Sequence, residues 1–130
     1  MCQDKGKAMY EVTVKIGASP SNYWRKLEFT DQKGKVHIRE ISGDRKASKQ
    51  SNTLEALIQS LKVLGKPCML NIYSGEDYLV AAFQNGWIND WQKHNWKNKK
   101  GNEVRNSGQW QQVWELLTPH SRRVMKCQEA

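Results

Sequence analysis

Three runs of alternating apolar and polar residues open the chain, and their order constrains the fold more than any other feature of the sequence. The runs cover residues 10–16, 24–30 and 36–41. A period of two is typical of strands that bury one face. Residues 17–20, which include a glycine and a proline, end the first run, and residues 31–34 form a hairpin signal between the other two. We therefore predict three consecutive strands in an antiparallel meander.

The period changes to that of an amphipathic helix over residues 52–64. Its apolar side follows the i, i+3, i+4 spacing and consists of Leu54, Leu57, Ile58, Leu61 and Leu64. Asn52 is placed to cap this helix, and Glu55, three residues later, is placed to complete a capping box. The short apolar run of residues 68–74 predicts a fourth strand, which a helical crossover should place parallel to the first strand and beside it.

The second half of the chain adds further helices. Residues 74–77 mark a helix start, and that helix should end before Gly86. Residues 107–117 fit a last helix, and residues 122–127 fit a final short strand. A chain of 130 residues is the size of one domain. We predict a single α/β domain in which residues 1–9 are flexible.

The charge balance indicates what such a domain would bind. The chain carries 21 Lys and Arg against 13 Asp and Glu, a formal net charge of +8. Such an excess attracts polyanions such as nucleic acid or an anionic membrane surface, although a basic surface can also be inert. No apolar stretch approaches the roughly 20 residues of a membrane span, and the N-terminus has no apolar run typical of a signal peptide. We therefore expect a cytoplasmic protein with no membrane partner.

The three cysteines, Cys2, Cys68 and Cys127, are widely spaced and form no C-x-x-C pair. This pattern predicts neither a disulfide framework nor a zinc site. We expect reduced thiols, with Cys68 in the core.

Aromatic and basic residues interleave over residues 87–114, which hold five of the six tryptophans. Residues 91–105 alone have a net charge of +4, from one glutamate and five cations: Lys93, Lys97, Lys99, Lys100 and Arg105. Charge runs are usually solvated faces, but cations on an aromatic scaffold can also contact phosphates. Trp110 and Trp114 lie four residues apart on the last helix and should be core, whereas Trp87, Trp91 and Trp96 should pack the basic segment against that helix.

These features together resemble the ribonuclease H family of the cellular type. Three meander strands, a helix, a parallel strand and further helices follow that family's order. The similarity is carried by residues 74–80 with 87–91, by residues 91–97 with 104–106, which are similar to the family's basic protrusion, and by residues 52–55, which resemble its Asn-x-Met-Glu step. The resemblance implies an α/β mixed sheet flanked by helices. It also implies an RNA/DNA hybrid as substrate and two magnesium ions, held by acidic side chains, that cut the RNA strand.

The sequence departs from the family at the metal-binding positions. Ile16 stands where the first strand should carry an aspartate, and Gly75 stands where the fourth strand should end in one. Glu55 matches the helix glutamate and is the one candidate catalytic residue. The family's mobile His loop and its final helix, which bears the last acidic residue, have no counterpart in the 130 residues. A single carboxylate cannot hold two divalent cations, so we predict no metal site. Glu76 could substitute only through a local bulge.

We therefore expect a monomeric module that binds an RNA/DNA hybrid or duplex and has a degenerate nuclease centre. The residues expected to contact nucleic acid are Asn52, Lys93, Trp96, Lys97, Lys99, Lys100, Arg105 and Asn106. The alternative is an active hybrid endoribonuclease that uses Glu55, a rearranged acidic site and Mg²⁺ or Mn²⁺. A third class is a protein-interaction domain in which an apolar patch replaces the acidic cluster.

Overall fold

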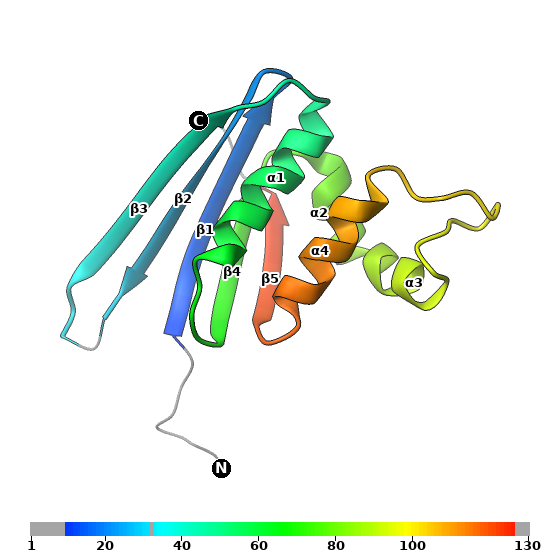
Figure 1. Cartoon of the computed structure of the whole chain (residues 1–130). Coiled ribbons are helices and arrows are strands. Elements are labelled where there is room, and N and C mark those ends of the chain that lie inside the picture. Colours follow the sequence, from blue (N-terminus) through cyan, green and yellow to red (C-terminus); the bar gives the residue numbers. More distant parts are fainter. Residues whose placement is uncertain (1–9, 32, 127–130) are drawn as a thin grey trace, which may run out of the picture.

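The computed structural model describes residues 10–31 and 33–126. These residues form one five-stranded sheet with the strand order β3-β2-β1-β4-β5, together with four helices (Figure 1). The strands are β1 (Tyr10–Ser19), β2 (Asn22–Thr30), β3 (Val36–Asp44), β4 (Cys68–Ser74) and β5 (Ser121–Lys126). The helices are α1 (Lys49–Lys62), α2 (Asp77–Gln84), α3 (Trp87–Lys93) and α4 (Ser107–Leu117).

The predicted α/β topology is confirmed. β1, β2 and β3 pair in antiparallel order as the meander requires. β4 lies parallel to β1, and β5 lies parallel to β4. Because α1 connects β3 to β4, the crossover places the carboxyl ends of β1 and β4 side by side, with Ile16 paired to Ser74. The predicted flexible start, residues 1–9, and Cys127 lie outside the described residues.

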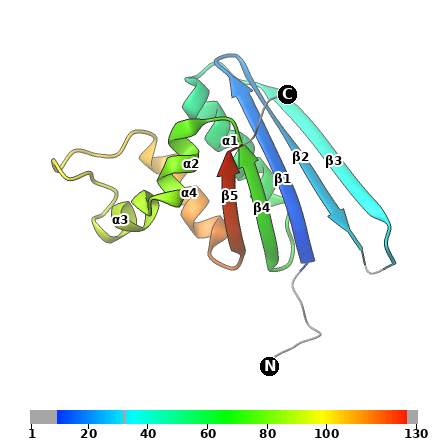
Figure 2. The same cartoon turned by 180° about the vertical axis from the view of Figure 1, so that it is seen from behind.

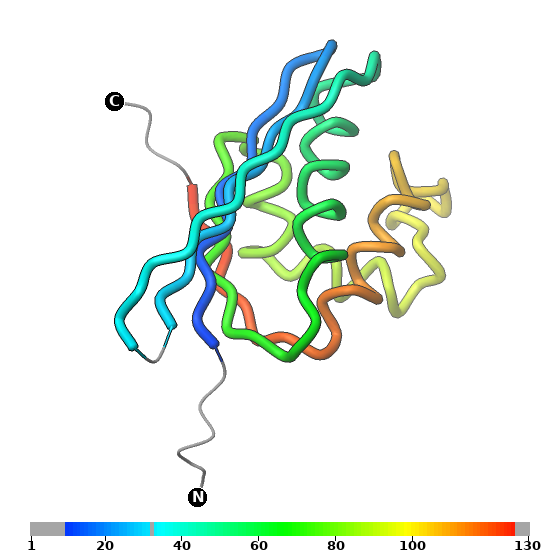
Figure 3. Tube along the Cα trace, turned by 60° about the vertical axis from the view of Figure 1, so that its left-hand side comes forward, coloured from blue at the N-terminus to red at the C-terminus, as the bar shows by residue number. Residues whose placement is uncertain are grey.

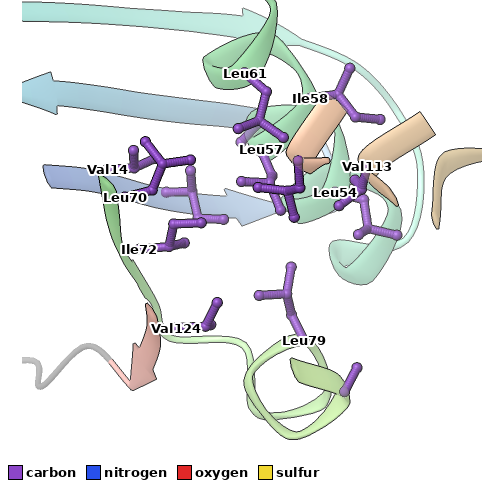
Figure 4. Close-up of a cluster of buried hydrophobic side chains, with 14 of the residues drawn as sticks. Val14, Leu54, Leu57, Ile58, Leu61, Leu70, Ile72, Leu79, Val113 and Val124 are labelled. Atoms are coloured by element: carbon purple, nitrogen blue, oxygen red, sulfur yellow. The ribbon is translucent and has the colours of Figure 1, made fainter. Parts of the chain in front are cut away.

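All four helices lie on the same side of the sheet (Figures 2 and 3). The core fills the space between them and the strands, as alternation predicts: Val12, Val14 and Ile16 of β1 point inward and are nearly inaccessible to solvent. Figure 4 shows Leu57 and Leu61 of α1 in the same buried cluster as Val14, Leu70 and Ile72. Cys68 is also buried, as the sequence predicted. No helix in residues 10–31 and 33–126 combines the length and apolar character needed to cross a bilayer.

The start of α1 differs from the prediction. The helix begins at Lys49, and Ser48 is the N-cap, with its hydroxyl oxygen accepting the backbone N–H of Ser51 at 3.0 Å. Asn52 and Glu55 therefore lie inside the helix and form no capping box. Ser48 takes the cap because its extended backbone and short side chain suit this position.

Four strands and one helix also have different bounds from those predicted. β2 begins two residues earlier than predicted, at Asn22, and β5 spans Ser121–Lys126 rather than residues 122–127. β1 continues through Ser19, which pairs with Asn22 across a tight turn, and β3 continues to Asp44. Both strands lengthen because residues 17–19 and 42–44 each find a partner in β2. α2 is capped by Glu76 rather than by Ser74. The predicted bounds of β4 and α4 are confirmed.

Candidate functional site

The carboxyl ends of β1 and β4 carry no carboxylate. Ile16 is 2% exposed and Ser74 is fully buried, so both side chains belong to the covered face of the sheet. The Ser74 hydroxyl accepts the backbone N–H of Glu76 at 3.1 Å, and Gly75 is exposed and has no side chain to offer. Because Ile16 is buried, its side chain adds no exposed apolar surface at this point.

The remaining acidic candidates have partners within the fold. Glu55 is half-buried, and its carboxylate accepts a hydrogen bond from the Gln59 amide at 2.7 Å. Glu76 caps α2 through the backbone N–H of Tyr78. Glu11 lies at the other end of β1 and accepts a hydrogen bond from Asn71 at 2.7 Å.

The residues at the strand ends do not fit a two-metal centre. No group of three or more His, Cys, Asp or Glu able to hold a metal ion occurs in residues 10–31 and 33–126. Divalent cations such as Mg²⁺ take oxygen ligands, usually including one or two carboxylates. A pair of such ions would therefore depend on Glu55 alone among the expected positions.

Asn52 lies in the interior of the protein. The sequence had predicted that this residue caps the helix or contacts nucleic acid. It is 0% exposed, and its amide donates to the carbonyls of Ser19 at 2.8 Å and Arg45 at 2.7 Å. Its carbonyl accepts from the Arg45 guanidinium at 2.8 Å. The capping role was wrong because Ser48 caps the helix. The side chain also has no exposed surface from which to contact a ligand, because it is fully buried and makes three hydrogen bonds within the protein.

A polar network extends from Asn52 to α4. The Arg45 guanidinium also donates to the Ser51 hydroxyl, which in turn donates to the Gln109 side chain at 2.7 Å. The Gln109 amide returns a hydrogen bond to the Ser51 carbonyl at 3.0 Å. This network joins the β3–α1 connection, α1 and α4. No local pattern revealed it, because Ser51 and Gln109 are 58 residues apart.

Residues 94–106 form a loop that extends away from the body of the protein between α3 and α4, which we call the projecting loop (Figure 1). A β-bridge pairs Lys97 with Glu103. Inside it, the Asn98 carboxamide oxygen accepts the backbone N–H groups of Lys100 and Asn102, both at 3.0 Å. Gly101 takes a φ of 85°, which closes the turn. The backbone of the loop is thus ordered by its own hydrogen bonds.

The five predicted cations are exposed on this loop and beside it: Lys93, Lys97, Lys99, Lys100 and Arg105. Lys99 and Lys100 occupy the turn, whereas Lys93 ends α3. Arg105 lies close enough to Tyr78 to counter the effect of burial, which raises the pKa of the Tyr78 phenol. The five cations of residues 93–105 therefore lie on the projecting loop and at the end of α3 beside it.

One tryptophan pair attaches the projecting loop to α4, and a second pair joins α3 to α4. Trp96 is half-buried and packs edge-to-face on Trp114, with ring centroids 6.5 Å apart. Trp91 meets Trp110 in the same way at 5.4 Å, and Trp110 is 0% exposed. These contacts confirm the predicted core role of Trp110 and the packing role of Trp91 and Trp96. Trp114, also predicted as core, is only partly buried, and Trp87 packs on Tyr78 and Trp91. Asn106 is partly buried and opens α4 with a φ of 60°.

A family model for RNase H matches residues 19–128. The chain belongs to the RNase H family. Ribonuclease H of Caldanaerobacter subterraneus subsp. tengcongensis is 40% identical over 83 residues, which cover 63% of this chain and 54% of that protein. Ribonuclease H of Lachnoclostridium phytofermentans is 35% identical over 102 residues, covering 78% of this chain and 65% of that protein. The chain thus spans between half and two thirds of these relatives.

Solved structures support the RNase H fold. LC9-RNase H1, described as a type 1 RNase H with the type 2 active-site motif, superposes with a TM-score of 0.79 and 15% identity, covering 95% of this chain and 65% of that one. The foamy viral protease-reverse transcriptase in complex with RNA/DNA hybrid has a TM-score of 0.66 and 13% identity, covering 97% of this chain and 19% of that one.

Proposed function

We propose that this RNase H-family chain binds RNA/DNA hybrid or duplex nucleic acid through its projecting loop and does not cut it. The observation that carries the proposal is that the exposed cations and the ends of the strands lie in different parts of the structure, and the strand ends carry no carboxylate. Four exposed cations lie on the projecting loop and Lys93 lies beside it, and Trp96 packs this loop against α4, whereas the strand ends present Ile16, Ser74 and Gly75.

Phosphate binding is the chemistry that this loop suits best. Lysine and arginine side chains that neutralise phosphates release counterions, and this release supplies much of the affinity of sequence-independent binding. Such contacts orient the protein on the nucleic acid without reading its bases. Lys97, Lys99 and Lys100 lie on a backbone that hydrogen bonds already order, so less conformational entropy is lost when they bind.

The family relation supports a hybrid or duplex as the ligand. The foamy viral relative is described in complex with RNA/DNA hybrid and also with dsDNA. Among the residues proposed as contacts, Lys93, Lys97, Lys99, Lys100 and Arg105 are exposed, and Trp96 and Asn106 are partly accessible. We also propose that the protein is monomeric and cytoplasmic.

Hydrolysis in this family fold would require divalent cations, and the strand ends do not fit them. In an in-line displacement two metal ions stabilise the attacking and the leaving oxygen. Ile16 and Ser74 lie on the covered face of the sheet, and Glu55 is hydrogen-bonded to Gln59. We therefore propose a degenerate nuclease centre.

A labelled RNA/DNA hybrid tests binding and cutting in one gel. We expect retention of the hybrid by the wild type and no RNA cleavage in Mg²⁺ or Mn²⁺. Replacing Lys97, Lys99 and Lys100 with glutamine should reduce retention strongly. The matched control replaces Lys15, Lys33 and Lys35, which are exposed on β1 and the β2–β3 hairpin, and should retain the hybrid. The absence of retention for hybrid, dsDNA and dsRNA alike would refute the proposal.

The second candidate is an active endoribonuclease that uses Mg²⁺ or Mn²⁺. Its support is Glu55, which lies at the family's helix position and is half-exposed. It predicts metal-dependent cutting of the RNA strand that the Glu55→Gln variant abolishes. Cutting that survives in Glu55→Gln would point to a contaminating nuclease rather than to this site.

A further inference from the structure

A groove of about 660 Å³ lies on the helix side of the sheet, between β1–β3 and the carboxyl end of α1. This volume is typical of small-molecule sites. β2 and β3 are at the opposite end of the sheet from β5, and the projecting loop lies beyond the β5 side (Figure 1). The groove is therefore separate from the surface proposed for nucleic acid.

The floor and the wall of the groove are mainly apolar. Leu27 and Phe29 lie two residues apart on β2, so both point into the groove. Val12 of β1 lies beside them. Val63 and Leu64, which follow α1, form the wall. Val63 is 56% exposed, so this wall is open to solvent.

One end of the groove carries an uncompensated cation. Arg25 is in phase with Leu27 and Phe29, and its side chain is only 5% exposed. Its Nε has no hydrogen-bond partner in the described structure, and Nη1 reaches only the carbonyl of Arg39, at 3.5 Å. Burial, and then the like charge of Arg39, lowers the pKa of the Arg25 guanidinium. A buried charge without a partner is costly, so this end of the groove is suited to an anion.

Asp31, the acidic residue that lines the groove, already has hydrogen-bonding partners within the protein. The Asp31 carboxylate lies within hydrogen-bonding distance of His37 Nε2, at 2.9 Å, and accepts the backbone N–H groups of Lys33 and Lys35, each at 2.9 Å. His37 in turn stacks on Phe29, with ring centroids 4.8 Å apart. No salt bridge in residues 10–31 and 33–126 joins Arg25 to a carboxylate.

We propose that this groove binds a small monoanion with an apolar body, its carboxylate held between Arg25 and Arg39 and its body lying over Leu27 and Phe29. Guanidinium groups match the planar geometry of a carboxylate. Phe29 lies four positions after Arg25 on β2, about 13 Å at the usual rise, which gives the apolar body room to extend. A nucleotide fits less well, because the apolar lining offers few donors or acceptors for a base and a dianionic phosphate.

Decanoate is the probe that we would use first. Its binding to the full chain can be followed by ¹H–¹⁵N NMR and calorimetry, with decanol as the uncharged and decyltrimethylammonium as the cationic counterpart. We expect decanoate to bind at least about tenfold more tightly than either counterpart, as loss of a charge-assisted contact implies. The amide shifts should fall on Val12, Leu27 and Val63.

Three variants locate the site. Arg39→Gln removes an exposed cation, and Val63→Glu places a negative charge on the exposed wall, so both variants should fold. Each should weaken decanoate binding about tenfold or more. Arg123→Gln removes an exposed cation from β5, at the far edge of the sheet, and should leave the affinity unchanged.

Several results would overturn the proposal. Equal affinity for decanol, unchanged affinity in Arg39→Gln, or shifts confined to other surfaces would each do so. Displacement of decanoate by an RNA/DNA hybrid would assign the groove to nucleic acid instead. Failure of hybrid binding at the projecting loop would leave the inference standing, because the two surfaces are separate.

Discussion

Replacing Asn52 with alanine distinguishes its role in the fold from a role in binding. The side chain is 0% exposed and makes three hydrogen bonds, to Ser19, to the Arg45 carbonyl and with the Arg45 guanidinium. Alanine removes all three. We expect a large loss of stability and little change in the affinity of the folded protein for nucleic acid.

The expected loss of stability follows from the hydrogen-bonding groups that lose Asn52 as their partner. Two carbonyl oxygens lose their donor, at about 1–3 kcal/mol for each buried group. The Arg45 guanidinium is half-exposed and keeps its hydrogen bond to Ser51, so losing its hydrogen bond to Asn52 should cost little stability. We expect Asn52→Ala to lower the free energy of unfolding by about 2–4 kcal/mol, a large part of the 5–15 kcal/mol typical of a domain.

Urea unfolding followed by circular dichroism measures this difference. Asn89→Ala, which changes an exposed asparagine in α3, is the control and should stay within about 0.5 kcal/mol of the wild type. A loss below about 0.5 kcal/mol in Asn52→Ala, together with weaker hybrid binding, would refute the structural role and restore the nucleic-acid contact.

Three further changes test other parts of the structure. Ser48→Ala removes the cap of α1 and should cost about 1 kcal/mol in the same unfolding assay; no loss would place the helix start elsewhere. His120 is buried, its Nδ1 accepts the Cys68 N–H at 2.9 Å, and burial lowers its pKa from 6.5. The unfolded chain therefore binds more protons below pH 6.5, so stability should fall as the pH is lowered through that range. His120→Asn keeps an acceptor and should lack this part of the pH dependence; an identical pH profile would contradict it. Trp96→Ala removes the contact with Trp114 and should speed amide exchange in the projecting loop, whereas unchanged exchange would show that the loop does not depend on it.

Elements with strong local signals were predicted well. Cys68–Ser74 and Ser107–Leu117 have the predicted bounds because turn or cap residues flank an apolar pattern. The start of α1 was placed four residues late, since Ser48 and Asn52 are both good caps and only backbone geometry decides between them. β1 extends past Gly17 because β2 offers partners that lie across the turn.

The sites were predicted less completely than the fold. The cations of residues 93–105 could be identified because charge and aromatic residues coincide in the sequence. The interior position of Asn52 could not, because its partner Ser19 is 33 residues away. Arg25 left a signal that was overlooked: it alternates in phase with Leu27 and Phe29, which places a charge on the covered face of the sheet. The lack of a salt bridge from Arg25 to any carboxylate of residues 10–31 and 33–126 is visible only in three dimensions.

The salt dependence of hybrid binding tests the central claim most directly. Fluorescence anisotropy of a labelled RNA/DNA hybrid between about 50 and 200 mM salt gives the slope of log K against log salt, which is about 0.7–0.9 per phosphate contact. The variant with Lys97, Lys99 and Lys100 replaced by glutamine should show a slope smaller by about 2–3 than the wild type, whereas the variant of Lys15, Lys33 and Lys35 should match the wild type. Equal slopes in the wild type and the loop variant would contradict the claim that the projecting loop holds the phosphates.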